Sequence, residues 1–251
     1  MTPAEQAVLE GVIAVRAALH AQSREVQRIL IREDKDDRPV TQLEKRARAA
    51  GIVVERVPAE VIDSVASGTT HGGVLAIAGP RLYASLKELG ADQGASFLAL
   101  LDGIEDPFNF GYALRSLYAA GAHGAVLGPR NWMSAAGTVG RASAGASELL
   151  PLAVADPMEA LEHCAARGLV IVCAAAERDA RPVYDADLRG PLLLVIGGER
   201  RGISRSVLSR ADVVVQIPYG RDFRGSLGTT SAAAVLAFEV LRQRRNRAAL
   251  P

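Results

Sequence analysis

The chain has 251 residues, of which 49% are hydrophobic and 23% charged. This composition is typical of a globular protein and argues against a disordered, collagen-like or coiled-coil chain. The longest uninterrupted apolar stretch, residues 169–176, is far shorter than the roughly 20 residues that a membrane helix needs. The first residues lack the charged and then apolar pattern of a signal peptide, so we expect a soluble, cytoplasmic protein.

The net charge of +1 hides an uneven distribution of charged residues. Residues 200–251 carry ten arginines against three acidic residues. Clustered positive charge suits a polyanion such as a nucleic acid, and arginine pairs with phosphate through two parallel hydrogen bonds. An arginine-rich chain also arises from codon bias, so charge alone leaves nucleic-acid binding open.

The cysteines and histidines do not form a metal-binding or disulfide pattern. Two cysteines, Cys164 and Cys173, are too few for a disulfide framework, and the four histidines are scattered along the chain. We interpret both cysteines as small buried hydrophobic residues, and we expect no structural metal.

The first third of the chain is predicted to be a small α/β unit. Apolar residues recur at helical spacing in some segments, and β-branched runs mark others as strands. The predicted helices are residues 11–21, 40–50 and 59–65, and the predicted strands are residues 26–31, 52–57 and 73–78. Residues 79–94 contain a proline and several glycines and are predicted to be a connector with one short helix.

From residue 96 onward, strands and helices alternate regularly. The strands are almost wholly apolar, which is typical of a parallel sheet that is covered on both faces. We therefore expect an open α/β catalytic domain. The predicted strands are residues 97–101, 125–127, 152–154, 169–173, 192–196 and 213–217, and the predicted helices are residues 110–120, 133–143, 157–166, 204–211 and 227–245.

Three segments place polar residues where predicted strands end, which is the usual ligand edge of such a sheet. The first is residues 102–115, with the sequence DGIEDPFNFGYALR. Pro107 and Asn109 suit a helix entry, and Asn109 is able to cap the helix. A plain structural interpretation makes Asn109 a cap and Arg115 a solvated charge.

The second segment is residues 195–204, VIGGERRGIS. Its glycines permit positive φ angles and close approach of the backbone to a ligand, and Ser204 is able to cap the next helix. Glycine-rich turns between strands and helices are common, and this one lacks the spacing of the dinucleotide-binding GxGxxG motif. A nicotinamide-dependent enzyme is therefore a weak alternative.

The third segment is residues 217–231, IPYGRDFRGSLGTTS, which leads into an alanine-rich helix. It holds four hydroxyl side chains near the start of that helix, more than one cap requires. In isolation, Ser226 or Thr229 is explained as an ordinary cap.

Together the three segments resemble the motifs of the SPOUT class of methyltransferases, specifically the SpoU/TrmH-type RNA ribose 2′-O-methyltransferases. Residues 106–115 resemble the family's D-P-x-N-x-G-x-x-x-R segment, residues 197–204 its G-x-E-x-x-G-[LI]-S loop, and residues 217–230 its I-P-x-x-G…S-L-N-x-[ST] segment. Residues 141–146 (RASAGA) with the following Leu150-Pro151 agree with the family too, and residues 71–74 (HGGV) resemble its H-Q-G-V. The resemblance covers nearly the whole chain from about residue 11.

The resemblance implies a two-domain α/β protein. Residues 1–79 would form a ribosomal-protein-like RNA substrate-binding domain, residues 80–94 a linker, and residues 95–251 a methyltransferase domain tied in a trefoil knot. The implied function is transfer of a methyl group from S-adenosyl-L-methionine to a ribose 2′-oxygen of RNA. The N-terminal extension favours ribosomal RNA, transfer RNA being the alternative.

The resemblance also assigns site residues and partners. It implies a homodimer whose active sites combine residues of both chains, with no membrane or metal partner. The positions that match the family's functional residues are Asn109, Arg115, Glu199 and Ser226. The residues that would bind the cofactor are Gly197, Gly198, Glu199, Gly202, Ile217, Pro218, Ser226 and Leu227.

The family's matching arginine is usually treated as a proton acceptor. Because a guanidinium group stays protonated at accessible pH, we interpret Arg115 as a donor that steers the RNA phosphate or polarises the 2′-oxygen. The predicted RNA contacts are arginines of the N-terminal domain and of the C-terminal region. They are Arg28, Arg32, Arg46, Arg48, Arg221 and Arg224.

The sequence departs from the family at three positions. Gly228 stands where the family usually has asparagine, Gly225 replaces a residue that is often acidic, and Gly72 replaces the glutamine of H-Q-G-V. Loss of the asparagine removes an amide that is able to position the ribose or the cofactor. A non-catalytic RNA-binding or assembly protein that keeps the methyltransferase fold is therefore the second hypothesis.

Overall fold

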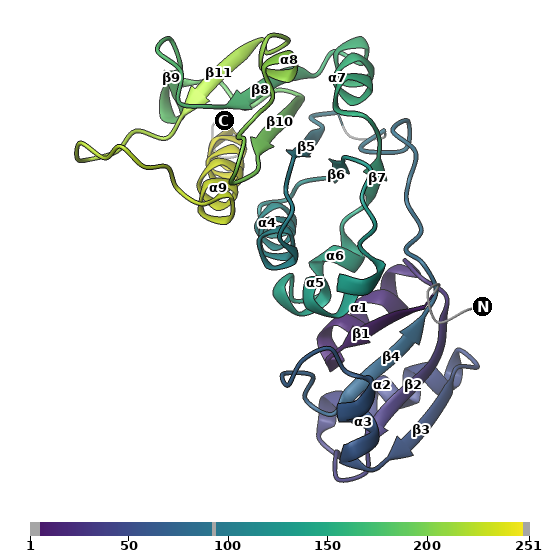
Figure 1. The fold of residues 1–251 in the computed structure, drawn as a ribbon. Coiled ribbons are helices and arrows are strands. Elements are labelled where there is room, and N and C mark those ends of the chain that lie inside the picture. The colour runs from purple at the N-terminus through teal and green to yellow at the C-terminus, as the bar shows by residue number, and fades with distance from the viewer. Residues whose placement is uncertain (1–5, 92–93, 248–251) are drawn as a thin grey trace. The chain divides into compact units, whose positions relative to one another are not determined.

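The protein is described by a computed structural model that covers residues 6–91 and 94–247 (Figure 1). The chain divides into two compact units, each with a sheet of its own. The first unit comprises Met1–Leu82 and Asn131–Leu149, and the second comprises Tyr83–Arg130 and Leu150–Pro251. The predicted α/β class, with a parallel sheet in the second unit, is confirmed.

The first unit contains a four-stranded sheet with the order β1-β4-β2-β3. β2 and β3 are parallel, whereas β4 is antiparallel to both β1 and β2. The first strand was not expected, because four residues are too few to show a period. The strands are β1 (Ala7–Glu10), β2 (Val26–Arg32), β3 (Val53–Val57) and β4 (Val74–Ala78).

Helices cover both faces of this sheet. On one face, α1 (Val12–Ala21) and α2 (Arg38–Ala49) pack on Ile29 and Ile31. On the other face, α3 (Ala59–Val65) packs on Leu30 and Leu75. The alternation along β2 follows from the two-residue period of a strand, which sends neighbouring side chains to opposite faces.

Residues 131–149 belong to the first unit, although the sequence analysis placed them in the second domain. The single helix expected at residues 133–143 is a 3-10 turn, η2 (Met133–Ala135), followed by α5 (Ala136–Ala142), and an unpredicted α6 (Ala146–Leu149) comes next. Glycines allow this segment to pack closely. A Cβ at Gly137 would meet Glu10, and one at Gly145 would meet Ala17 of α1.

Two buried carboxylates hold this segment in the first unit. Glu10 of β1 forms an ion pair with Arg141 of α5. Glu148 of α6 is 2% exposed and pairs with Arg24 at 3.1 Å and with Arg81 at 3.2 Å. Ser23 donates a further hydrogen bond to Glu148 at 2.6 Å. Buried charges are tolerated when they are paired and hydrogen-bonded in this way.

The second unit contains a parallel seven-stranded sheet with the order β7-β6-β5-β10-β8-β11-β9 (Figure 1). The order places β10, which precedes the glycine-rich segment, at the centre of the sheet. The strands are β5 (Phe97–Asp102), β6 (Gly124–Leu127), β7 (Leu152–Val154), β8 (Val170–Ala174), β9 (Arg181–Pro182), β10 (Leu192–Gly197) and β11 (Val213–Gln216).

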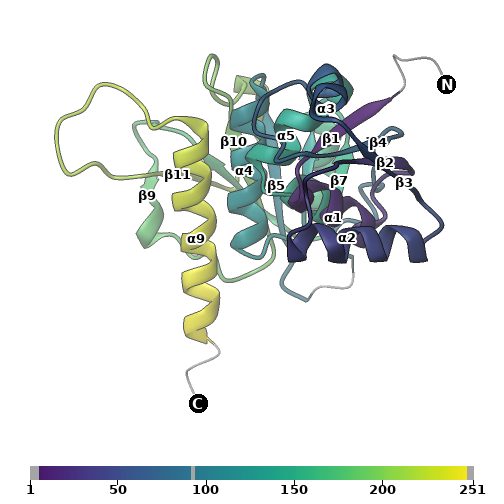
Figure 2. The ribbon, with the colours of Figure 1, turned by 90° about the horizontal axis from the view of Figure 1, so that it is seen from below.

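Helices also cover both faces of the second sheet. On one face, α7 (Pro157–Ala166) and α8 (Arg205–Leu208) pack on the buried apolar residues of β5, β8 and β10. On the other face, α4 (Pro107–Ala119) and α9 (Thr229–Arg247) lie side by side (Figure 2). The guanidinium of Arg244 in α9 lies 5.5 Å from the centre of the Phe97 ring, a cation–π contact that ties α9 to β5.

Some expected elements differ from the structure. In the described part of the connector, residues 79–91 form turns and extended chain rather than a short helix. Neither β9 nor the 3-10 turn η3 (Val183–Asp185) was expected, since neither is long enough to produce a periodic pattern. The trefoil knot that the resemblance implies stays a prediction.

Candidate functional site

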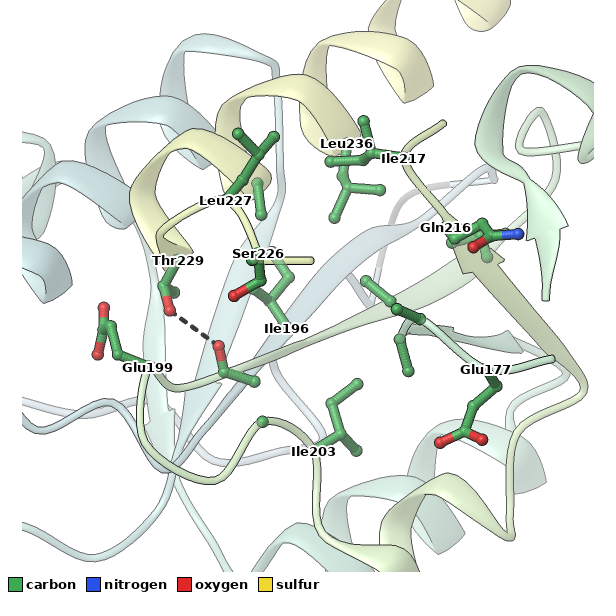
Figure 3. Close-up of a pocket in the computed structure, with 18 of the residues that line it drawn as sticks. Glu177, Ile196, Glu199, Ile203, Gln216, Ile217, Ser226, Leu227, Thr229 and Leu236 are labelled. Carbon is green, nitrogen blue, oxygen red and sulfur yellow. Dashed lines mark hydrogen bonds between the residues drawn. The ribbon is translucent and has the colours of Figure 1, made fainter. Parts of the chain in front are cut away.

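A cavity of about 750 Å³ opens at the carboxyl ends of β8, β10 and β11 in the second unit (Figure 3). This is the edge of a parallel sheet at which ligands usually bind. The volume lies in the range of small-molecule pockets, about 300–1,000 Å³. The segments after the three strands and the first turns of α9 supply the lining. The site is therefore built from parts of the chain that are distant in sequence.

The glycine-rich turn after β10 forms one wall of the cavity. A Cβ at Gly197 would collide with the backbone of Gly202, and a Cβ at Gly198 would collide with the carbonyl of Gly103. Gly202 has a φ of +62°, which favours glycine. The turn consequently requires glycine at three positions and presents its main chain to the cavity.

Hydrogen bonds fix this turn to its neighbours. Gly198 donates its backbone N–H to the carbonyl of Asp102 at 2.7 Å, and the Asp102 carboxylate accepts a bond from the Ser204 N–H at 3.0 Å. The buried hydroxyl of Thr229, at the start of α9, donates to the carbonyl of Gly197 at 3.0 Å (Figure 3). The turn is thus held between β5 and α9.

The third motif forms the opposite wall. The Tyr219 hydroxyl accepts a hydrogen bond from the Leu227 N–H at 3.1 Å, and the rings of Tyr219 and Phe223 meet edge to face with 5.6 Å between their centres. These contacts fold residues 217–228 back on themselves. They place Ser226 and Leu227 over the cavity, facing Ile196 and Glu199 (Figure 3).

All eight residues that the sequence analysis assigned to cofactor binding line this one cavity. They come from the turn after β10 and from the two ends of the segment between β11 and α9. Glu199 and Ser226, which were also assigned to catalysis, are among them and are exposed to solvent. The floor of the cavity is apolar and includes Ile196, Ile203 and Leu236 (Figure 3).

Asn109 and Arg115 are not among the residues that line this cavity. The helix cap is Asp106, whose carboxylate accepts a hydrogen bond from the Asn109 N–H at 2.9 Å, so the expectation that Asn109 is the cap is wrong. Arg115 lies on an exposed concave face formed by α4 and α9, beside Thr230 and Ser231.

Comparison with known proteins identifies the chain. The profile of the SpoU rRNA Methylase family matches residues 96–238, and the profile for RNA 2′-O ribose methyltransferase substrate binding matches residues 8–84. The chain belongs to the SpoU family. The prediction of an RNA ribose 2′-O-methyltransferase is thereby confirmed.

Similarity to known proteins extends over almost the whole length of the chain. The 23S rRNA (guanosine-2′-O-)-methyltransferase RlmB of Shewanella oneidensis is 32% identical over 246 residues, covering 96% of this chain and 99% of the relative. A crystal structure of an RNA 2′-O ribose methyltransferase is 26% identical, covers 96% of this chain and 90% of the other, and has a TM-score of 0.78. The SpoU methyltransferase AviRb of Streptomyces viridochromogenes, solved with AdoMet, shares the fold with a TM-score of 0.81 at 23% identity, covering 97% and 92% of the two chains.

Some residues of the cavity were not predicted from the sequence. Residues 174–177, after β8, line the cavity, and Gln216, Tyr219 and Thr229 do as well. The available signal was the end of the strand predicted at residues 169–173, but the segment AAAE that follows carries no motif. Its place beside β10 depends on strand order, which the sequence pattern does not give.

The arginines predicted to bind RNA in the SpoU chain fall into two groups. Three arginines of the first unit have acidic partners at the surface: Arg28 with Glu55, Arg32 with Asp34 and Arg48 with Glu44. Arg46 has no side-chain partner among the described residues, and neither have Arg221 and Arg224 of the second unit. Arg224 also lines the cavity.

Both cysteines are buried and free, as expected. Burial raises the pKa of the Cys164 thiol to about 11 and that of Cys173 to about 12, so neither thiol is a ready nucleophile. Within residues 6–91 and 94–247, no cluster of three metal-ligating side chains occurs. Among the same residues, no helix has the length and apolar character needed to cross a membrane.

Proposed function

We propose that this chain methylates the ribose 2′-oxygen of a guanosine in 23S ribosomal RNA. The observation that carries the proposal is the convergence of the second and third family motifs around one cavity, in a chain that is 32% identical, over 96% of its length, to a 23S rRNA guanosine 2′-O-methyltransferase. The similarity to this rRNA methyltransferase includes both the N-terminal and the C-terminal parts of the chain, and it therefore supports a ribosomal rather than a transfer RNA substrate.

The cavity has the features that S-adenosylmethionine needs. Its apolar floor suits an adenine ring, and the close-packed turn at Gly197, Gly198 and Gly202 presents main chain rather than side chains to the cavity. Ile217, Pro218 and Leu227 close the opposite wall. We assign the cofactor to these residues together with Glu199 and Ser226.

Bound there, S-adenosylmethionine supplies an electrophilic methyl group on a sulfonium centre. The remaining task of the protein is alignment, which is worth several kcal/mol and on the order of 7–11 at the limit. Glu199 and Ser226, exposed at the mouth of the cavity, are positioned to orient the ribose hydroxyls by hydrogen bonding. No described side chain of the site has the properties of a strong base, so we assign the hydroxyl proton to water.

The proposed homodimer is supported by the exposed face of α4 and α9. Four aromatic side chains on these helices are each about half exposed, between 44% and 52%, namely Phe108, Tyr112, Tyr118 and Phe238. Isolated chains rarely expose such a concentration of aromatic area, whereas protein interfaces are enriched in it. Arg115 lies with Tyr112 and Phe238 on this face, so a second copy seated there would contact Arg115.

We further propose that residues 1–79 bind the RNA, that residues 80–94 link them to a knotted methyltransferase domain at residues 95–251, and that the protein acts in the cytoplasm. The substrate-binding profile over residues 8–84 supports the first assignment. The inclusion of residues 131–149 in the first unit refines the expected boundaries, because the RNA-binding part then contains a segment of the methylase region.

The decisive experiment is methyl transfer from labelled S-adenosylmethionine to 23S rRNA that lacks the modification, followed by mapping of the methylated nucleotide. Arg115→Ala is expected to retain cofactor affinity and to lower turnover about 100-fold or more, the typical effect of removing a transition-state donor. Arg210→Ala, an exposed arginine on the other side of the sheet, is the control. RNA binding without transfer by the wild type would favour the non-catalytic alternative, and unchanged turnover of Arg115→Ala would refute its assigned role.

A further inference from the structure

A second cavity, of about 240 Å³, lies in the first unit where α1 and α2 pack side by side. This volume is about eight times that of a water molecule in the liquid. The lining residues are Arg16, Leu19, His20, Gln22, Arg46 and Ala50. Four of the six side chains are hydrogen-bond donors, and none is a carboxylate. The chemistry of the lining therefore matches an anion.

The two arginines and the histidine of this cavity are exposed and have no partner inside the described protein. The side chains of Arg16, His20 and Arg46 form no hydrogen bond or ion pair with any residue in the described ranges. By contrast Arg48, two residues after Arg46 on α2, is held by Glu44 at 2.7 Å. Two free guanidinium groups and an imidazole around one cavity are available to a ligand from outside.

Helix energetics do not account for the whole cluster. His20 and Arg46 lie in the last turns of α1 and α2, where a positive charge interacts favourably with the helix dipole. Arg16 lies one turn before His20 on the same face of α1, too far from the helix end for its charge to be explained by the helix dipole.

The backbone at Gln22 supplies an independent observation. Gln22 ends α1 in the left-handed region, with φ +49° and ψ +34°, where glycine is the preferred residue. A non-glycine residue there is strained, and strain of this kind collects at binding sites. Its amide lines the same cavity. Glutamine in place of glycine thus adds a hydrogen-bonding group to the cavity, although glutamine is less favourable than glycine in this backbone conformation.

We propose that this cavity is a phosphodiester-binding subsite for the RNA substrate, formed by Arg16, His20, Gln22 and Arg46. Arginine suits this role because its planar group donates two parallel hydrogen bonds to phosphate oxygens. The inference rests on the proposed function, since it places a backbone contact of the same RNA. It also assigns RNA binding by the N-terminal part to Arg46 rather than to Arg28, Arg32 and Arg48, which have acidic partners.

The test compares Arg46→Ala with Arg48→Ala in the full-length chain. Both variants remove one arginine from the last turn of the same helix, so they change the net charge equally. Binding of a 23S rRNA transcript is measured by filter retention in rising salt. Arg46→Ala is expected to bind on the order of fivefold to tenfold more weakly, with a salt slope smaller by about one. Arg48→Ala is expected to stay close to the wild type.

Gln22→Gly provides a signature that a folding defect would not give. Glycine relieves the positive φ, so the melting temperature is expected to be unchanged or higher. RNA affinity is nevertheless expected to fall about twofold to threefold, because one hydrogen-bond donor is lost. A gain in stability with a loss of affinity separates a ligand-binding role from a structural one.

The outcomes separate this subsite from the proposed function. Equal RNA binding by Arg46→Ala and Arg48→Ala, with methylation intact in the wild type, would overturn the subsite and leave the methyltransferase assignment in place. RNA binding that depends on Arg46, without methyl transfer by the wild type, would support the subsite and count against the proposed function. A wild-type chain that retains no RNA would overturn both.

Discussion

The buried carboxylates of the first unit and the cavity of the second unit place their polar groups in opposite surroundings. Glu10 and Glu148 are no more than 2% exposed, and each has an arginine partner. The large cavity instead exposes main-chain groups of glycines, and its two carboxylates, Glu177 and Glu199, face solvent. In this protein, therefore, the buried charged side chains hold structural elements together, whereas the exposed polar groups at the strand ends line the candidate binding site.

The largest effect on cofactor binding is expected from crowding the glycine turn. Gly198→Ala would place a methyl group against the backbone carbonyl of Gly103, and backbone cannot move aside as a flexible side chain can. We expect cofactor affinity to fall at least about tenfold, with a loss of about 1–3 kcal/mol in the free energy of unfolding. Calorimetric titration with S-adenosylmethionine and urea unfolding measure the two quantities.

Gly190→Ala is the matched control, because no atom lies within 4 Å of the added Cβ. Wild-type cofactor affinity in Gly198→Ala would show that the turn does not shape the cofactor site.

The next prediction tests the buried carboxylates of the first unit. Glu148→Gln removes the carboxylate charge that pairs with Arg24 and Arg81, both of which are buried. Breaking a buried ion pair on one side costs about 3–5 kcal/mol, so urea unfolding at neutral pH should show a large loss. Glu55→Gln, which removes the exposed partner of Arg28, should change the free energy by less than about 1 kcal/mol.

The Glu148 pair also has a defined pH dependence. Burial acts to raise the pKa of the Glu148 carboxyl, but attraction from Arg24 and Arg81 and the bond from Ser23 outweigh burial, so the pKa lies below its usual value of 4.5. A lowered pKa in the folded state stabilises the protein above about pH 4.5 and loses that contribution as the pH falls through the folded value. The difference between wild type and Glu148→Gln should therefore shrink in acid, and a difference that grows would contradict this assignment.

A smaller effect is expected from the link between α9 and the glycine turn. Thr229→Val keeps the shape of the side chain but leaves the Gly197 carbonyl without its hydroxyl donor. We expect a loss of about 1–2 kcal/mol in unfolding free energy, and a modest loss of cofactor affinity because the turn is less firmly held. Thr229→Ser keeps the hydroxyl and should stay close to the wild type. If the two variants were equally stable and bound the cofactor equally well, the hydrogen bond would contribute nothing.

The same contrast explains what the sequence revealed about the fold and the site. Strands such as β5 and β10 were predicted because fully apolar runs are a local signal, and motif residues at their ends were then expected at one sheet edge. Glu199 and Ser226 were assigned by the resemblance to the family, and they line one cavity.

Features that depend on distant partners escaped prediction. The place of residues 131–149 in the first unit depends on Glu10 meeting Arg141 and on Glu148 meeting Arg24, contacts that join residues more than 120 positions apart. Asp106 was overlooked as the cap of α4 because Asn109, three residues later, has the same preference for a cap position. Arg46 and Arg48 look alike in sequence, and only Glu44 distinguishes them.

The smallest effect concerns the position at which the chain departs from its family. Gly228 accepts the first backbone bond of α9, from the Ala232 N–H at 3.0 Å, and a Cβ added there would meet nothing within 4 Å. Gly228→Asn should therefore fold normally and gain a few tenths of a kcal/mol, because asparagine caps a helix better than glycine. Since Thr229 and Thr230 already provide hydroxyls at this helix start, we expect methylation to be retained or modestly raised. A methylation assay beside urea unfolding checks both parts, and a sharp fall in activity without loss of stability would mean that the site has adapted to the space that glycine leaves.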